Sequence, residues 1–252
     1  MFSESGMTDQ AYLVTGASSG VGRSLAELLG VRGAKVAVQG RDAHRLKEAA
    51  AQVDAAGGEG LPVNVDLADP TAAAKAVEET VTAFGRLDGL VLNASQFIPA
   101  PFEQATLAEL DEQWRVNVVS HFALVQAALP HLRPGAAIVF VSSTVAHAGF
   151  AACSTYATTK GAVEALARTL AIELAPRSIR VNTVAPGFVR TPMLHPHLEA
   201  IEGYEDALND KTPVGRIGEP QEVAVAIAFL LSPEAAYICG TTVVVDGGWT
   251  AQ

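Results

Sequence analysis

Tyr156 and Lys160 are the residues of this sequence whose types and spacing are best suited to proton transfer. They are four positions apart, and the apolar residues Ala165, Leu166 and Leu170 that follow predict a helix, so both side chains share one face. A free tyrosine has a pKa of about 10, and a neighbouring ammonium group favours its phenolate form. The pair could therefore exchange a proton near neutral pH, although tyrosine and lysine at this spacing also occur by chance in many helices.

A second group, Gly16, Gly20 and Gly22, forms a glycine-rich turn with the order G-x3-G-x-G. The turn lies between a strand predicted at Tyr12–Thr15 and a helix predicted to begin directly after it. Glycines permit a tight turn and allow the backbone N–H groups at a helix start to bind a pyrophosphate. The sequence therefore predicts a dinucleotide site here, and three glycines that merely form a turn are the alternative.

The residues after the second predicted strand indicate which dinucleotide is preferred. Gly40 and Arg41 follow that strand about 20 residues after the glycine turn, where dinucleotide domains bind the adenosine ribose. A carboxylate here would select NAD(H), whereas Gly40 carries no charge and Arg41 is a cation. We therefore expect NADP(H), although Asp42 lies close by and Arg41 could instead be a solvated surface residue.

The elements that must position these residues alternate along the chain. Seven runs rich in β-branched residues predict strands at Tyr12–Thr15, Lys35–Gln39, Leu61–Val65, Leu87–Leu92, Ala136–Val141, Ile179–Val184 and Thr241–Val245. Helical patterns lie between them, and the first has an apolar stripe from Val21 to Leu29 and a stop at Gly33. This order predicts an α/β, doubly wound (Rossmann-type) single domain with a seven-stranded, mostly parallel sheet flanked by helices on both faces.

We expect residues 11–252 to form this domain and residues 1–10 to be a flexible arm, because the first ten residues lack the basic start and apolar region of a signal peptide. Residues 191–215 contain several prolines and no strand pattern, so we expect a substrate lid there, with an ordered connection as the alternative. The longest apolar run, Val223–Leu231, has nine residues, whereas a membrane span needs about 20. We expect no membrane partner.

Composition narrows the possible partners and location. The chain has 252 residues, of which 49% are hydrophobic, and a formal net charge of −10, which disfavours nucleic acid as a partner. Two cysteines, Cys153 and Cys239, cannot form a disulfide framework, so a cytoplasmic location is the simplest expectation. His195 and His197 lack a third ligand in helical register, and we expect no catalytic metal.

These motifs occur in the order found in the short-chain dehydrogenase/reductase family, which the chain resembles from about Ala11 to Trp249. The glycine turn resembles the family's cofactor turn, and Tyr156-x3-Lys160 resembles its active-site motif. Ser143 precedes Tyr156 by thirteen positions, which is the family's usual serine spacing and favours Ser143 over Ser142. Asn117 resembles the family's helix asparagine.

The resemblance also implies the residues that contact each ligand. Cofactor contacts would be Gly16, Ser18, Ser19, Gly20, Val21, Gly22, Arg41, Asp66, Leu67, Asn93, Ala94, Ser95, Tyr156, Lys160, Pro186, Gly187, Val189 and Thr191. Substrate contacts would be Ser95, Val145, Phe150, Phe188, Met193 and Leu194. One position departs from the family, because Ser95 stands where its Asn-Asn-Ala-Gly pattern has a glycine.

The resemblance implies an oxidoreductase that transfers a hydride between NADP(H) and a small carbonyl or secondary alcohol. Tyr156 would exchange a proton with the carbonyl oxygen and Ser143 would donate a hydrogen bond to it. Lys160 would hold the nicotinamide ribose, and Asn117 would anchor a water. It also implies a homo-oligomer, either a dimer or a tetramer. Two alternatives are an NAD-dependent alcohol dehydrogenase of the same family and a non-catalytic NADP(H)-binding sensor or scaffold.

Overall fold

A computed structural model describes residues 6–69 and 71–252 of the chain. In these residues there is one seven-stranded sheet of order β3-β2-β1-β4-β5-β6-β7, and every neighbouring pair is parallel. The strands are β1 (Ala11–Val14), β2 (Lys35–Gly40), β3 (Glu59–Asn64), β4 (Leu87–Leu92), β5 (Leu132–Val141), β6 (Arg180–Pro186) and β7 (Thr242–Val245). The predicted fold is confirmed, and the sheet is wholly rather than mostly parallel over the described strands.

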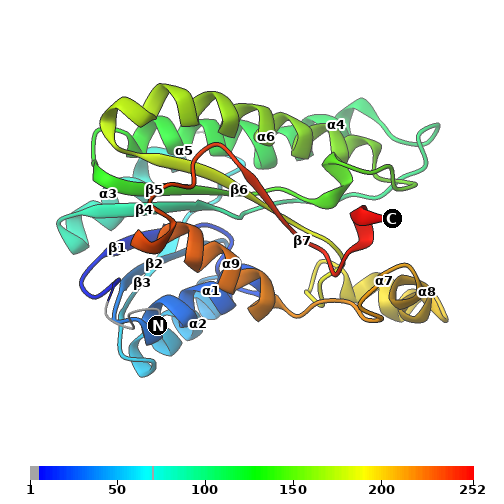
Figure 1. Ribbon diagram of the computed structural model, residues 1–252, viewed down its shortest axis with the longest axis horizontal. Helices are drawn as coiled ribbons and strands as arrows, with labels where there is room; N and C mark the ends of the chain where they lie inside the picture. Colours follow the sequence, from blue (N-terminus) through cyan, green and yellow to red (C-terminus); the bar gives the residue numbers. More distant parts are fainter. Residues whose placement is uncertain (1–5, 70) are drawn as a thin grey trace.

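Helices cover both faces of the sheet (Figure 1). One face carries α1 (Gly20–Val31), α2 (Ala43–Ala55) and α9 (Pro220–Leu231). The other carries α3 (Ala72–Phe84), α4 (Leu107–Trp114), α5 (Ser120–Ala128) and α6 (Ser154–Leu174). A π-helical turn at Arg115–Val119 joins α4 to α5. Two short helices, α7 (His195–Ala200) and α8 (Tyr204–Asp210), lie beyond the edge of the sheet where the strands end.

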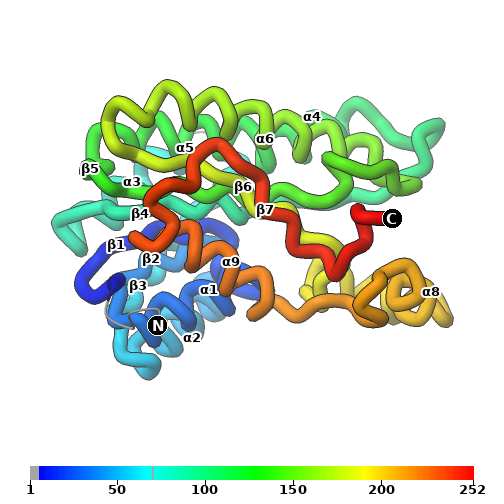
Figure 2. Tube along the Cα trace, in the orientation of Figure 1, coloured from blue at the N-terminus to red at the C-terminus, as the bar shows by residue number. Residues whose placement is uncertain are grey.

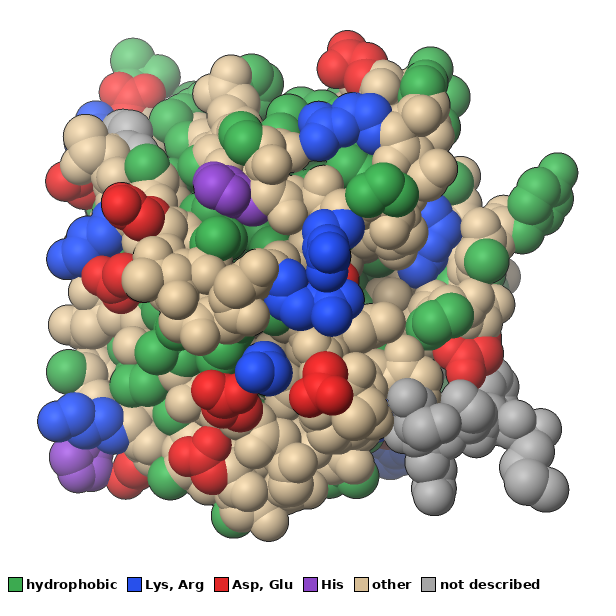
Figure 3. All heavy atoms as spheres, turned by 90° about the vertical axis from the view of Figure 1, so that its left-hand side faces the viewer, with side chains coloured by type: hydrophobic (Ala, Val, Ile, Leu, Met, Phe, Trp, Pro, Cys, Tyr) green, Lys and Arg blue, Asp and Glu red, His purple; other side chains and the backbone are tan. Residues whose placement is uncertain are grey.

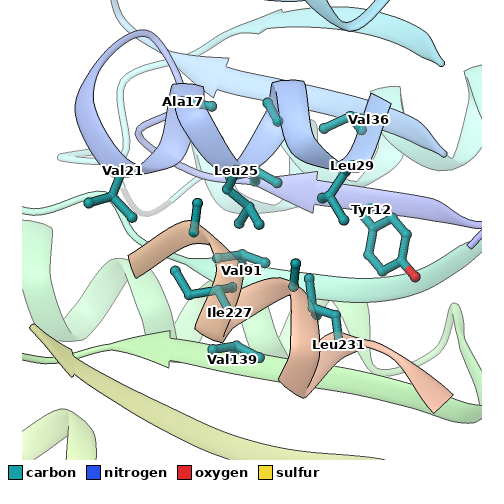
Figure 4. Close-up of a cluster of buried hydrophobic side chains, with 14 of the residues drawn as sticks. Tyr12, Ala17, Val21, Leu25, Leu29, Val36, Val91, Val139, Ile227 and Leu231 are labelled. Atoms are coloured by element: carbon teal, nitrogen blue, oxygen red, sulfur yellow. The ribbon is translucent and has the colours of Figure 1, made fainter. Parts of the chain in front are cut away.

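Because both faces are covered, the central strands β1 and β4 are buried over almost their whole length, and two separate clusters form the core. Figure 4 shows the first cluster, in which Leu25 of α1 and Ile227 of α9 point toward Val91 and Val139 of the sheet. The second cluster lies between the sheet and α3, α5 and α6. The sheet between these two cores is a rigid base whose strand ends can hold a site.

Part of the expected N-terminal arm belongs to the domain. Residues 1–5 are outside the described residues, but Met7 is only 1% exposed and packs in the first core cluster. Asp9 N–H donates to the carbonyl oxygen of Gly33, and Gln10 accepts from Lys35 N–H. The interpretation of residues 6–10 as a loose arm is therefore wrong, because an apolar side chain and two backbone hydrogen bonds fix them on the domain.

The C-terminal segment runs alongside the connection that follows α8 (Figure 2). Val214 N–H donates to the carbonyl oxygen of Gly247 at 3.1 Å, and the side chain of Gln252 donates to the carbonyl oxygen of Lys211 at 2.7 Å. Two segments far apart in sequence therefore meet beside α7 and α8. They stabilise the part of the molecule that lies over the strand ends.

The opposite end of the sheet faces the viewer in Figure 3, where basic side chains have acidic side chains among them. At the beginnings of the strands, Lys35 of β2 pairs with Glu59 of β3 at 2.9 Å, and Arg86 pairs with Asp88 of β4 at 2.6 Å. Among the helices of residues 6–69 and 71–252, none combines the length and hydropathy that a membrane span requires.

Candidate active site

A cleft of about 960 Å³ opens where the strands end. Parallel sheets of this kind bind ligands at the point where strand order reverses, which here is between β1 and β4. The predicted residues that line it are Gly16, Ser18, Ser19, Gly20, Val21, Arg41, Asp66, Leu67, Asn93, Ala94, Ser95, Ser143, Val145, Phe150, Tyr156, Lys160, Pro186, Gly187, Phe188, Val189, Thr191, Met193 and Leu194. Gly22 and Asn117 are predicted residues that lie behind its wall.

The glycine turn is shaped by close contacts that no side chain would permit. A Cβ on Gly16 would lie 2.9 Å from the Cα of Ala94, and a Cβ on Gly22 would lie 2.6 Å from the carbonyl oxygen of Gly16. Gly16 and Gly20 also have φ values of +63° and +54°, which glycine adopts without strain. Ser19 then enters α1 without capping it through its side chain, so the helix start is available to an anion. The turn fits a dinucleotide pyrophosphate.

Two arginines and one carboxylate follow β2 at the far end of the cleft. Asp42 accepts hydrogen bonds from the backbone N–H groups of His44 and Arg45 and so caps α2. These hydrogen bonds lower the pKa of Asp42, and the bond from Arg45 N–H has the largest effect. The Asp42 carboxylate also lies 3.4 Å from Nε of Arg45. Arg41 and Arg45 both line the cleft. The sequence prediction missed Arg45, whose position one helical turn after Arg41 was the available signal.

Tyr156 and Lys160 both lie in the first turns of α6 and line the cleft. Lys160 is 1% exposed, and its Nζ lies 2.8 Å from the carbonyl oxygen of Val141, to which it donates, and 5.3 Å from the centre of the Tyr156 ring. Burial lowers the pKa of Lys160 to about 7, and the carboxylate of Glu164 opposes that change. The helix therefore presents a lysine that changes charge near neutral pH beside the tyrosine.

The pKa of Tyr156 is higher than that of a free tyrosine, whereas a neighbouring ammonium group predicts a lower value. Burial raises the pKa of Tyr156 to about 12, and a side-chain hydrogen bond with Ser95 acts in the opposite direction. The ammonium group of Lys160 donates to the carbonyl oxygen of Val141. The expectation that Lys160 and a bound nicotinamide together lower the pKa of Tyr156 stays a prediction.

The two serines after β5 have different surroundings. Ser142 is buried, and its hydroxyl donates to the carbonyl oxygen of Lys160 at 3.3 Å. Ser143 is half-buried and precedes the 3-10 turn Thr144–Ala146, where its Oγ accepts a long hydrogen bond of 3.4 Å from Val145 N–H. Ser142 therefore fixes α6 on the sheet, whereas Ser143 presents a weakly bonded hydroxyl at the cleft.

Two asparagines form the framework of the site. Asn93 donates to the carbonyl oxygens of Thr15 and Gly16, which joins the end of β4 to the glycine turn. Asn117 is fully buried in the π-helical turn, where its Oδ1 accepts from Gln96 N–H at 2.7 Å. Its Nδ2 donates to the Gln96 carbonyl oxygen at 2.9 Å and to Oγ1 of Thr159 at 3.0 Å. Its side chain thus holds the segment after β4 against α6.

Aromatic side chains form the outer walls of the site. The ring of Phe97 lies 5.0 Å from that of Tyr156 and 5.9 Å from that of His197, so it joins the catalytic candidate to α7. Phe150 and Phe188 are 5.5 Å apart and both contact Trp249 near the C-terminus. Phe97 was missed by the sequence prediction, although it is only two positions after Ser95.

The two histidines of the 191–215 segment have separate partners. His195 lies 3.3 Å from Glu199, and His197 contacts Phe97. In the parts of the chain that the structure describes, no three His, Cys, Asp or Glu side chains are close enough to hold a metal ion together. His197 is thus an aromatic wall of the cleft.

Comparisons with known proteins cover nearly the whole chain. A family profile described as enoyl-(acyl carrier protein) reductase matches residues 16–250. An uncharacterised oxidoreductase of Methylorubrum extorquens is 38% identical over 94% of this chain and 96% of its own length. Tropinone reductase-like 3 of Erythroxylum coca is 37% identical over 94% of this chain and 91% of its own.

A solved structure agrees in fold as well as in sequence. A short-chain dehydrogenase of Burkholderia cenocepacia in complex with NADP has a TM-score of 0.91 and 35% identity, covering 97% of this chain and 99% of that chain. The profile matches a range of residues that includes the glycine turn and the Tyr156 and Lys160 pair, and the Methylorubrum relative covers nearly the whole chain. The solved structure has the same fold as this chain. The chain is an oxidoreductase and belongs to the short-chain dehydrogenase/reductase family.

Proposed function

We propose that this chain is an NADP(H)-dependent oxidoreductase that interconverts a carbonyl group and a secondary alcohol on a small organic substrate. The observation that carries the proposal is the position of Ser143, Tyr156 and Lys160 in one cleft with a glycine turn fitted to a pyrophosphate. Bound NADPH would supply the hydride. The protein's own groups would then have to orient the substrate and move one proton.

Each side chain has a role that matches its surroundings. Tyr156 donates its phenolic proton to the carbonyl oxygen during reduction and accepts it during oxidation, and a pKa of about 12 keeps it protonated for the first direction. Ser143 donates a hydrogen bond to the same oxygen and stabilises the charge that develops there. Lys160 binds the nicotinamide ribose. The side chain of Asn117 holds the Gln96 segment in place, and the residue would anchor a water on the route to solvent.

The preference for NADP(H) is supported by the charges after β2. Gly40 has no side chain, and a Cβ there would come within 3.3 Å of the Ser18 hydroxyl, so a carboxylate at this position would crowd the turn. Asp42 is engaged by the start of α2 and by Arg45. Arg41 and Arg45 are then the cations available to the 2′-phosphate. The Burkholderia relative in complex with NADP supports the same assignment.

The substrate we propose is an apolar or moderately polar ketone. Five of the predicted substrate contacts that line the cleft are apolar: Val145, Phe150, Phe188, Met193 and Leu194. Phe97 adds a ring directly against Tyr156. The Erythroxylum relative is named tropinone reductase-like 3, which supports a carbonyl substrate.

Residues 191–215 act as the substrate lid in this proposal. Their first residue, Thr191, lies against the glycine turn, since a Cβ on Gly20 would be 3.3 Å from its Cγ2. Arg190, just before the lid, pairs with Glu205 of α8 at 2.6 Å and with Glu219 before α9 at 3.3 Å. The pair with Glu219 joins the chain before the lid to the chain after it, and the pair with Glu205 holds α8 of the lid to Arg190. His197 of α7 lines the cleft between them.

We also propose that the enzyme is a homo-oligomer of the cytoplasm. Four apolar side chains are exposed on the helices of one face: Trp114, Val119, Phe122 and Ile172. Such a surface is suited to a second copy of the chain. Cys153 and Cys239 are both free, as in a reducing compartment. Sedimentation at working concentration tests the assembly, because a monomer would contradict it.

The decisive experiment follows NADPH oxidation by absorbance across a panel of ketones, aldehydes and quinones, with NADH in parallel. Turnover with NADPH is expected, and the Tyr156→Phe variant should abolish it. Equal turnover with NADH would instead favour the NAD-dependent alternative. Tight NADPH binding without turnover on any compound would favour the non-catalytic sensor.

A further inference from the structure

Trp249, near the C-terminus, packs against two phenylalanines that are predicted substrate contacts. Its ring centre lies 5.1 Å from that of Phe188 and 6.1 Å from that of Phe150, and the two phenylalanine rings are 5.5 Å apart. All three separations are in the range of a favourable aromatic contact. Phe150 and Phe188 line the cleft, whereas Trp249 is not among the described residues that line it, so the indole lies behind them.

The three rings come from segments that are far apart in the sequence. Phe150 belongs to the connection between β5 and α6, which also carries Ser143. Phe188 lies in the turn that follows β6, and Trp249 lies in the segment that follows β7. The side chain of Trp249 therefore joins two loops that border the cleft.

The backbone that carries Trp249 is fixed without help from its ring. The Asp246 carboxylate accepts hydrogen bonds from Gly248 N–H at 2.9 Å and from the N–H and hydroxyl of Thr250 at 2.8 and 2.7 Å. Gly248 has a φ of +88°, and a Cβ there would lie 3.3 Å from Cγ of Pro213 near the end of the lid. The indole thus projects from a hydrogen-bonded turn that packs against the lid.

We infer that Trp249 is a positioning residue that sets the width of the substrate site by holding Phe150 and Phe188 in place. Trp249 is half-buried, and the removal of a large packed side chain leaves a space into which its neighbours relax. Without the indole, the rings of Phe150 and Phe188 can turn away from the cleft toward that space. The site then accepts a ketone with a larger ring and holds a small ketone less firmly.

The turn after β6 does not depend on the indole for its backbone position. Gly187 N–H donates to the carbonyl oxygen of Val245 at 3.0 Å, and a Cβ on Gly187 would lie 2.7 Å from Cβ of Asp246. These contacts are the same whichever side chain follows Gly248. We therefore expect a change at Trp249 to alter the choice of substrate and to leave NADPH binding nearly unchanged.

The inference rests on the proposed function for its catalytic meaning, and the first test is kinetic. We would compare acetophenone and 2-acetylnaphthalene, two methyl ketones that differ in ring size, with NADPH as the reductant. Trp249→Ala should raise the ratio of kcat/KM for 2-acetylnaphthalene to kcat/KM for acetophenone about tenfold, and Trp249→Phe, which keeps a smaller ring, about threefold. Kd for NADPH should stay within about twofold in both variants. Tyr237→Ala is the matched control, since Tyr237 is a fully exposed aromatic residue, and it should leave the ratio unchanged.

An unchanged ratio in Trp249→Ala would overturn the inference, even if both kcat/KM values fell together. An increase in Kd for NADPH as large as the change in the ratio would also overturn it, because Trp249 would then act through the cofactor.

The second test needs no turnover. A crystal structure of Trp249→Ala should show the rings of Phe150 and Phe188 displaced toward the vacated space, and unchanged ring positions would overturn the inference. If the rings move as expected but no ketone is reduced by any form of the protein, the proposed function fails and the positioning role of Trp249 stands.

Discussion

Nε2 of His121 lies 3.0 Å from the carbonyl oxygen of Ala94, so a histidine of α5 holds the segment that carries Asn93 and Ser95. The ring is fully buried and Nδ1 has no hydrogen-bond partner among the described residues. Burial, with a smaller effect of the Lys160 charge, lowers the pKa of His121 to about 3. The imidazole is therefore neutral in the folded protein and donates through Nε2–H.

This histidine predicts a loss of stability in acid. Its pKa is lower in the folded chain than the value of about 6.5 expected when unfolded, so the stabilisation is complete above pH 6.5 and is lost as pH falls toward 3. Between pH 7 and pH 5 the free energy of unfolding should fall by about 2 kcal/mol from this group. His121→Gln keeps an N–H donor but does not titrate, and urea unfolding at both pH values should show a smaller fall. An equal fall in both proteins would refute the assignment.

Tyr156→Phe should reduce turnover by about 10²-fold or more, the usual range for loss of a general acid, while Kd for NADPH stays within about twofold. The reason is that only the phenolic oxygen is removed and the ring keeps its contact with Phe97. Tyr204→Phe is a matched control, since Tyr204 also lines the cleft but lies on α8. Fluorescence titration and NADPH oxidation measure the two effects separately. Retained turnover in Tyr156→Phe would exclude it as the acid.

Arg41→Ala should lower kcat/KM with NADPH by about 10- to 100-fold and leave the value with NADH nearly unchanged, because a charge-assisted hydrogen bond to phosphate is removed. Arg45→Ala should have a smaller effect, since Arg45 also pairs with Asp42. Arg23→Ala controls for the change in net charge, as Arg23 pairs with Glu48 at 3.5 Å outside the cleft. Parallel losses with both cofactors would argue against recognition of the 2′-phosphate.

Phe97→Ala should raise KM for an aryl ketone about three- to tenfold, with a smaller change for a short aliphatic ketone, because an aromatic contact beside Tyr156 is lost. Phe97→Leu should have an intermediate effect. Phe102→Ala is the matched control, since Phe102 is 81% exposed. Steady-state kinetics with both ketones would test the substrate class, and equal changes for the two would show that Phe97 has no part in selectivity.

The elements of the fold could be predicted because each follows a local pattern. Parallel strands buried on both faces must be apolar along their whole length, and a glycine turn between strand and helix has a spacing that backbone geometry restricts. The boundaries shifted by a few residues, as for β5, which begins at Leu132 rather than Ala136. The pairing of Tyr156 with Lys160 could be predicted for the same reason, because side chains four positions apart on a helix lie on the same face.

Features that depend on contacts between distant segments could not be predicted in this way. Met7 is buried by α1 and its neighbours, which no pattern in the first ten residues records. Phe97 and His197 are 100 positions apart and meet only because α7 lies over the cleft. Asp42 lies close to the predicted ribose site in the sequence, but in the fold its side chain caps α2 and accepts hydrogen bonds from backbone N–H groups.

The contact between α1 and α9 has a consequence for how the chain is made. Leu25 and Leu29 of α1 are covered by Ile227 and Leu231 of α9, which lie 202 residues later in the sequence (Figure 4). As the chain is synthesised on the ribosome, the apolar stripe of α1 therefore stays uncovered until nearly the whole chain has been made. Incomplete chains are expected to aggregate or require a chaperone, and premature stop codons late in the reading frame should be as damaging as early ones.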